Sequence, residues 1–325
     1  MISINKSKLI IYWIFIFLSN ITFSQEIAFP NKPVHLIVTF PPGGTTTFVG
    51  RLIAQKLSDI WNQPVILENK PGANSTIGTE YVVKSKPDGY TILLVVNTHV
   101  INPLVMKLPY DTFKDLTPIC TIYSTEYVLV THPSVSGSNL QEFISKYKLT
   151  SASLSYASGD AGGITNLVSE LFNMQSGLKI KGIPYKGSAP AVADTIGGHV
   201  QVFIGPPSLV VQHIQSGKLK PLAVTGSKRI SGLPNVPTFK ESGMQNFNVT
   251  TWYGLLAPAG TPKSIVDKIS KDIEKILNLK DVKESLNSQG LETLISGPED
   301  FESLMRADHL KYENVINSSQ INFNQ

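Results

Sequence analysis

Apolar residues along the first third of the chain alternate between short continuous runs and helical stripes, with turn residues between them. Residues 35–40, 64–68 and 90–96 are apolar runs of strand length, and 48–61 and 73–84 carry apolar residues at helical spacing. Strands that alternate with helices in this way are typical of parallel α/β architecture. The pattern therefore predicts a βαβαβ unit in this part of the chain.

The middle of the chain repeats the alternation with shorter elements. Its apolar runs and stripes predict strands at 127–131, 154–157, 180–184, 200–204 and 221–224, and helices at 140–148, 164–173, 189–196 and 209–215. A series of this length can bury a core of its own. We therefore expect it to form a second lobe.

The C-terminal part of the chain returns to helices and one short strand. Thr261 and Pro262 suit the N-cap and the first position of a helix, and an apolar stripe at 265–276 continues it. A strand is expected at 291–295 and a closing helix at 298–316. Because one short strand cannot form a third lobe, we expect this part to pack on the first.

The chain would then cross between the lobes twice, near 120–128 and near 249–256. Two crossings make a hinge, and a hinge makes a cleft that can close on a ligand. The expected fold is α/β, with two Rossmann-like lobes joined by two crossover strands. Lobe I is assigned to 25–124 and 252–325, and lobe II to 125–251.

The first 24 residues have the features of an export signal. Lys6 and Lys8 precede an apolar run at 9–18, and the small residues that follow suit cleavage. The alternative is a retained anchor helix, which needs roughly 20 apolar residues, whereas this run is interrupted at Asn20. We therefore expect a cleaved signal peptide at 1–24 and a mature protein in the periplasm.

Charge and cysteine content exclude several classes of protein. The formal charge of the 325-residue chain falls from +4 to +2 when the two leader lysines are removed, and the remaining lysines are dispersed. A nucleic-acid partner is therefore not expected. Cys120 is the only cysteine, which excludes an internal disulfide and a thiolate metal site. We expect a monomer with no metal and no cofactor.

Candidate chemistry lies in the loops after the strands, because parallel sheets bind ligands beyond the carboxyl ends of their strands. In lobe I, two glycines follow the first strand and precede a helix, so backbone amides and the helix N-terminus can approach an anion. The alternative is that the glycines only make a turn and a threonine caps the helix. A phosphate-specific loop is disfavoured because no Gly-Lys-Ser/Thr sequence follows. The expected binding residues are Phe40, Pro42, Gly43, Gly44, Thr46 and Thr47.

Lobe II carries a counterpart, again a strand, a glycine-rich loop and a helix. Asp160 in this loop either caps the helix or accepts a hydrogen bond from the ligand. Two helix N-termini facing each other across a cleft suit a ligand with polar or anionic groups at both ends. We expect these paired backbone cradles to hold the ligand without a fixed cationic side chain. The expected binding residues are Ser158, Gly159, Gly162, Gly163 and Thr165.

Other strand ends supply further candidates. Asn97 and Thr98 close the third strand of lobe I, next to the glycine loop, and we expect both to bind the ligand. His99 has no second histidine or carboxylate at metal-ligand spacing, so a structural role is favoured for it. Tyr185 and Pro206 end strands of lobe II, where they form an apolar cleft wall or pack at the edge of the sheet.

Several short motifs together resemble one family. They are Ile37–Gly44, Glu68–Ala73, Pro87–Thr91, Pro184–Pro190, Val236–Thr238 and Ala257–Pro262, in this order. Through them nearly all of the mature chain resembles the substrate-binding proteins of tripartite tricarboxylate transporters, also called Bug receptors. The resemblance implies a periplasmic type II binding-protein fold that closes on a di- or tricarboxylate, an acidic amino acid or an aromatic acid. It also implies the membrane permease subunits of such a transporter as partners.

The resemblance implies roles for the same loops. In the family, one ligand carboxylate is held, partly through ordered water, by the loop matching Pro42–Thr47 and the loop matching Asn97–His99. The helix start matching Ser158–Thr165 contributes from the other lobe. These are the loops that the physical argument selects.

Three residues depart from the family pattern, and one of these departures bears on the identity of the ligand. Thr47 stands where the family has an aspartate, and Gly163 and Asn166 stand where it has a serine and a histidine. The missing aspartate removes a negative charge beside the ligand, which weakens the case for an amino acid.

Two other functions fit parts of the pattern, namely a ligand-presenting sensor for a signalling receptor and a secreted α/β enzyme. No Gly-x-Ser-x-Gly elbow or His-Glu-x-x-His motif occurs, so we expect no catalytic activity.

Overall fold

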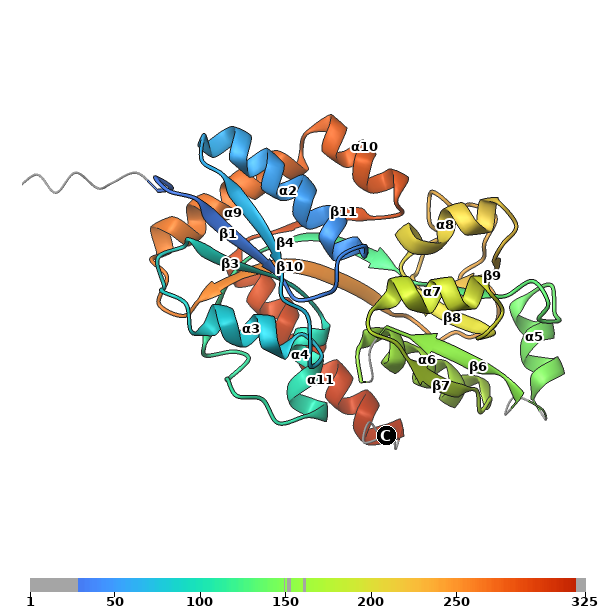
Figure 1. Ribbon diagram of the computed structural model, residues 1–325. Helices are drawn as coiled ribbons and strands as arrows, with labels where there is room; N and C mark the ends of the chain where they lie inside the picture. The colour runs from blue at the N-terminus through green and yellow to red at the C-terminus, as the bar shows by residue number, and fades with distance from the viewer. Residues whose placement is uncertain (1–28, 149, 151–152, 160–161, 320–325) are drawn as a thin grey trace, which may run out of the picture. The chain divides into compact units, whose positions relative to one another are not determined.

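The strands of the described chain form two sheets, one with six strands and one with five. The computed structural model describes residues 29–148, 150, 153–159 and 162–319 (Figure 1). The expected signal peptide at 1–24 lies outside these residues. From Lys32 onward the chain belongs to one compact unit. The two sheets with their helices confirm the predicted α/β class.

The first sheet combines parallel and antiparallel strands. Its order is β11 (Glu292–Ser296), β4 (Leu116–Glu126), β10 (Thr250–Pro258), β3 (Thr91–Val96), β1 (Val34–Val38) and β2 (Val65–Asn69). β1 runs parallel to β2 and β3, whereas β10 runs antiparallel to β3 and β4. Because β1 and β3 are parallel neighbours, the loops after Val38 and after Val96 leave the sheet at the same edge.

Six helices contact strands of this sheet, and they are α2 (Thr45–Trp61), α3 (Thr76–Val83), α4 (Thr98–Val105), α9 (Lys263–Leu277), α10 (Lys280–Ser288) and α11 (Pro298–Ser319). Trp252 of β10 is buried with its ring edge against Phe301 of α11, at 5.2 Å between centroids. Its indole N–H donates to Asp308 at 2.7 Å. The last helix is thereby fixed to the strand that leads towards the second sheet.

The second sheet is built from the middle of the chain. Its order is β7 (Lys181–Pro184), β6 (Ser155–Ser158), β8 (Val202–Gly205), β5 (Val128–Thr131) and β9 (Lys220–Val224). The helices of the same stretch are α5 (Leu140–Tyr147), α6 (Ile164–Ser176), α7 (Ser188–Ile196) and α8 (Pro207–Gln215). β6 is parallel to β7 and β8, so the loops that lead into α6, α7 and α8 leave the sheet at one edge.

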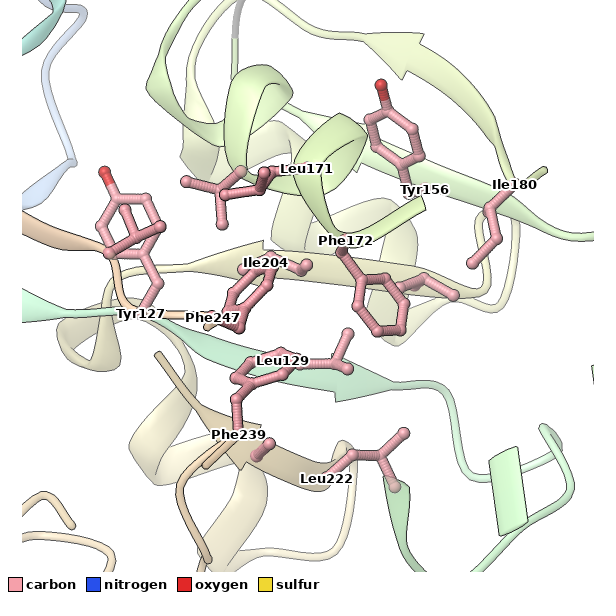
Figure 2. Close-up of a cluster of buried hydrophobic side chains, with 14 of the residues drawn as sticks. Tyr127, Leu129, Tyr156, Leu171, Phe172, Ile180, Ile204, Leu222, Phe239 and Phe247 are labelled. Carbon is pink, nitrogen blue, oxygen red and sulfur yellow. The ribbon is translucent and has the colours of Figure 1, made fainter. Parts of the chain in front are cut away.

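An aromatic cluster fixes the second sheet, and Figure 2 shows it. The rings of Phe239 and Phe247 stack with 4.1 Å between centroids, and Phe172 of α6 meets Phe239 edge-on at 5.8 Å. Leu129 of β5 and Ile204 of β8 belong to the same buried cluster. Full burial of each such side chain contributes roughly 1.5–3 kcal/mol, so the cluster holds the sheet and α6 in one arrangement.

The chain passes between the sheets through two adjacent strands. β4 ends at Glu126 and β5 begins at Val128, which leaves Tyr127 as the connecting residue. On the return, Thr250 at the start of β10 pairs with Glu126. If one sheet were to rotate against the other, these few paired residues would be the hinge.

The sequence prediction misplaced the start of α9 and missed two helices. The helix expected from Thr261 begins at Lys263 with Pro262 as N-cap, because the Thr261 hydroxyl donates to the carbonyl of Pro258 and closes the preceding turn. α4 and α10 were not predicted. α4 contains Pro103, which usually interrupts a helix, and α10 is mostly polar, with Val282 and Leu286 as its buried residues.

Candidate functional site

A cavity lies where loops of the two sheets meet. The space open to the centres of water-sized atoms is about 70 Å³, and one buried water needs roughly 10–15 Å³ of such space, so several waters or one small molecule fit. First-sheet segments contribute Phe40, Pro41, Pro42, Gly44, Thr45, Thr46, Val96, Thr98 and Tyr253. The remaining lining residues are Tyr127, Ile164, Thr165, Lys186, Gly187, Ser188, Ala189, Pro190, Pro206 and Leu209.

Five helices begin at this cavity, namely α2, α4, α6, α7 and α8. Their N-cap residues are Gly44, Asn97, Gly163, Gly187 and Pro206, and no side chain caps any of them. None of the five has an acidic residue in its first turn. The first backbone N–H groups of a helix have no partner within the helix, and they carry a partial positive charge. The cavity is therefore surrounded by electropositive helix ends suited to an anion.

Of the five described helices that begin elsewhere, α3 and α9 also have neither a side-chain cap nor an acidic first turn, whereas the other three differ. α5 is capped by Asn139, which accepts from the amide of Glu142, and Glu142 adds an acidic side chain to that first turn. α10 and α11 also have acidic first turns, with Asp281 and Glu299 respectively. Acidic side chains thus offset the partial charge at these three helix ends. The five helix ends around the cavity have no such acidic side chain in their first turns.

The glycine loop of the first sheet opens directly onto the cavity at Gly44. A Cβ built on Gly44 would have no heavy atom within 4 Å, so space remains in front of the helix start. Gly43 has φ +96°, a conformation that favours glycine, and it makes the turn. The Asn69 side chain holds the loop by donating to the carbonyl of Phe40 at 2.8 Å and to the Thr47 hydroxyl at 3.0 Å.

Of the six residues predicted in this loop, the cavity includes Phe40, Pro42, Gly44 and Thr46. Gly43 and Thr47 instead border a shallow groove on the outer face of α2, together with Arg51. The alternative that a threonine caps α2 is wrong, because Gly44 is the N-cap and no side chain bonds to the free amides. α2 also begins at Thr45, earlier than predicted, which brings its first turn into the cavity.

Thr98 is the candidate from the end of β3 that lines the cavity. It is buried, and its hydroxyl has no hydrogen-bond partner within the described residues. Asn97 is buried behind it and donates to the Tyr312 hydroxyl at 2.9 Å. His99 faces the carbonyl of Thr112 at 3.3 Å, and burial lowers its pKa to about 4, so the ring is neutral at physiological pH.

In the second-sheet loop, Thr165 lines the cavity and its neighbours shape the backbone. The Thr165 hydroxyl accepts from the amide of Gly159 at 2.8 Å, and the amide of Gly162 donates to Asn166 at 3.1 Å. Ser158 is buried, with a hydroxyl that has no partner among the described residues. The cavity lining contains none of Ser158, Gly159, Gly162 and Gly163 within the part of the chain that the structure describes. Asp160 lies outside the described residues.

Pro206 and Tyr185 were expected either to form an apolar cleft wall or to pack at the edge of the sheet, and the two residues differ. Pro206 lines the cavity, as an apolar wall would. Tyr185 does not line the cavity. Its hydroxyl donates to Asp194 of α7 at 2.7 Å, and its ring packs against a second buried cluster, which includes Val128 of β5 and Phe203 of β8. Tyr185 therefore supports α7 from outside.

Several lining residues were missed by the sequence argument. Tyr127 and Tyr253 come from the crossing segments, whereas that argument considered only the loops between strands and helices. Lys186 lies in the loop after β7 and Ser188 is the first residue of α7, and the strand-end rule selected the neighbouring Tyr185 instead. The described lining thus includes one cationic side chain, that of Lys186, and the expectation that no fixed cation holds the ligand stays a prediction.

The sequence matches one known family over most of its length. The model of the tripartite tricarboxylate transporter family receptor, TctC, matches residues 49–321. The chain belongs to this family of solute-binding receptors. The predicted resemblance is thereby confirmed. Within the described residues of this TctC receptor, no helix is long and apolar enough to span a membrane, and no cluster of three or more His, Cys, Asp or Glu side chains could hold a metal ion.

Individual relatives of this TctC receptor are similar over most of their length. Protein BugT of Bordetella pertussis is 34% identical over 291 residues, which is 89% of each chain. The structure of R. palustris Rpa4515 with adipate is 29% identical with a TM-score of 0.87, covering 90% of this chain and 99% of that one. MatC from Rhodopseudomonas palustris with bound malate is 29% identical with a TM-score of 0.82, covering 89% and 100%.

Proposed function

We propose that this receptor captures a small carboxylate in the cavity between its two sheets. The observation that carries the proposal is the convergence of five uncapped helix N-termini on one cavity. Such ends bind anions through free N–H groups and partial charge. The adipate and malate in two related structures support a carboxylate as the anion.

The proposed grip uses neutral donors on both sides of the cavity. The first turns of α2 and α6 offer backbone amides, and Thr98 offers a buried hydroxyl without a partner in the described chain. Neutral donors suit reversible capture, because they avoid the desolvation cost of a fully buried ion pair. The proposed ligand contacts among the predicted residues are Phe40, Pro42, Gly44, Thr46, Thr98, Thr165 and Pro206. Gly43, Thr47, Asn97, Ser158, Gly159, Gly162, Gly163 and Tyr185 would shape or support the loops.

Binding would proceed by closure of two lobes. Lobe I would comprise 25–124 and 252–325, and lobe II 125–251, with the hinge at the paired ends of β4 and β10. Membership of a family of transporter receptors supports capture without chemistry. The receptor would thus release its ligand unchanged.

The proposed setting is the periplasm of the cell that makes the protein. The leader at 1–24 has the charged start and short apolar run of a secretory signal, and cleavage there would release the mature chain. Membership of the transporter receptor family supports delivery of the ligand to membrane permease subunits. We expect the mature receptor to act as a monomer.

A thermal-shift screen of mature protein against carboxylic acids and their neutral amides tests the function. An acid present at 100 times its dissociation constant should stabilise the folded protein by about 2.7 kcal/mol, whereas the matched amide should not. Stabilisation by no acid, or by amides as strongly as by acids, would contradict the proposal. Calorimetric titration of each hit then gives its affinity and stoichiometry.

A further inference from the structure

Lys186 is the only residue with a full charge among the described residues that line the cavity. Its side chain is exposed, and within the described chain it has no ion pair and no hydrogen bond. It lies between the end of β7 at Pro184 and the start of α7 at Ser188. A positive charge that has no partner among the described residues thus lines a cavity surrounded by helix N-termini.

The backbone on both sides of Lys186 is fixed. The amide of Tyr185 donates to the carbonyl of Ser158 at 2.9 Å, and the amide of Gly187 donates to the carbonyl of Gly159 at 2.6 Å. Gly187 has φ +106°, and a Cβ at this position would meet the ring of Pro41, in the glycine loop of the first sheet, at 3.3 Å. The backbone position of Lys186 beside the first-sheet loop is therefore defined, and its side chain is one of those that line the cavity.

The charges around the cavity differ between its two ends. At the first-sheet end, the starts of α2 and α4 and the hydroxyls of Thr46 and Thr98 provide only neutral donors. At the second-sheet end, the start of α7 and the Ser188 hydroxyl are joined by Lys186. The nearest acidic residue of α7, Asp194, already accepts from Tyr185. Asp160, in the loop before α6, lies outside the described residues.

We infer that Lys186 is a specificity residue that selects dianionic ligands. One carboxylate would occupy the neutral cradle at Gly44 and Thr98, and the second would bind the Lys186 ammonium and the Ser188 hydroxyl. A ligand with one carboxylate would leave Lys186 unused. This inference rests on the proposed capture of carboxylates and adds which carboxylates are preferred.

The test is calorimetric titration with matched probes that differ by one charge. Succinate, glutarate and adipate are each compared with their own monomethyl ester, for the native protein and for Lys186→Gln, Lys186→Arg and Lys181→Gln. Lys181 is an exposed lysine of β7 outside the cavity lining, so its variant controls for a general loss of positive charge. The native protein should bind the best diacid about twofold to fivefold more tightly than its ester, the range expected for a partly exposed ion pair.

The variants then separate the two proposals. Lys186→Gln should lose the preference by weakening only the diacid, Lys186→Arg should restore most of it, and Lys181→Gln should retain it. Equal binding of diacid and ester by the native protein, or equal weakening of both by Lys186→Gln, would overturn the role of Lys186 while leaving carboxylate capture intact. Binding of no probe, with no acid found by the thermal-shift screen, would overturn both.

Discussion

The hydroxyl oxygens of Thr45 and Ser208 lie 2.5 Å apart, and this hydrogen bond joins the first turn of α2 to the first turn of α8. The two residues are 163 positions apart in the sequence and belong to helices that pack on different sheets. Thr45 lines the cavity, whereas Ser208 lies behind it. If the two lobes open as proposed, this bond between the starts of α2 and α8 has to break.

Replacing Ser208 by alanine should therefore speed the release of a bound acid. Loss of one hydrogen bond of about 1 kcal/mol that exists only in the closed form corresponds to roughly fivefold faster dissociation, with association little changed. Stopped-flow displacement of the acid found by the thermal-shift screen measures both rates. Ser216→Ala is the matched control, because that hydroxyl bonds locally to His213 at the end of the same helix. Equal rates for Ser208→Ala and native protein would rule out the bond as a latch.

Substitutions at Gly44 should separate binding from folding. Gly44 has φ −94°, which any residue adopts, and a Cβ there meets no atom within 4 Å. Gly44→Ala should therefore fold normally, whereas Gly44→Leu should fill the space in front of the α2 amides and abolish binding. Thermal unfolding and calorimetric titration of both variants check this, with Gly232→Leu as a control in similarly open space. Retained affinity in Gly44→Leu would show that the ligand does not use this helix start.

The elements with a strong apolar period could be predicted from sequence, and those governed by tertiary contacts could not. β1, β3 and α2 carry patterns that their buried faces explain, so their existence and order were found. α10 has too few apolar positions to show a period and is held by the residues it packs against. α4 follows β3 directly and contains Pro103, and its sequence therefore predicts the end of a strand followed by a loop.

The candidate site divides in the same way. Gly44 and Thr98 could be located because glycine and hydroxyl residues at strand ends have a local signature. Tyr253 reaches the cavity from a crossing strand, where its ring stacks on Tyr123 at 4.0 Å. Asn97 turns towards Tyr312, a partner 215 residues away. Contacts of this kind depend on how distant segments meet, which no local pattern records.

The crossing strands also contain a carboxyl whose titration should affect stability. The pKa of Glu126 is raised from 4.5 to about 7, because the effects of burial and of the nearby Glu292 carboxylate outweigh the hydrogen bond from Thr250, which lowers it. Because the folded-state pKa is the higher one, the folded protein binds this proton more tightly than the unfolded chain does. The resulting stability is complete below pH 4.5 and is lost as the pH rises to about 7, by up to about 2–3 kcal/mol.

Glu126→Gln should therefore remove this part of the pH dependence. At pH 8 the variant should be more stable than the native protein by up to about 2–3 kcal/mol, and at pH 4 the two should be equal. Urea unfolding at several pH values measures the difference. Glu284→Gln, on the exposed part of α10, should reproduce the native curve. A constant difference between Glu126→Gln and native protein at all pH values would show that the carboxyl does not titrate in this range.

The unpartnered hydroxyl of Thr98 provides the sharpest separation of function from stability. Valine has nearly the same shape, and removing a buried hydroxyl that lacks a partner does not cost a hydrogen bond in the free protein. Thr98→Val should therefore change the free energy of unfolding by less than about 1 kcal/mol, yet weaken acid binding about tenfold through the lost bond to a charged group. Thr131 of β5 is the matched control, because it is also buried with an unpartnered hydroxyl among the described residues but does not line the cavity. Thr131→Val should leave affinity unchanged, and if Thr98→Val did the same, this hydroxyl would have to be satisfied by something other than the ligand.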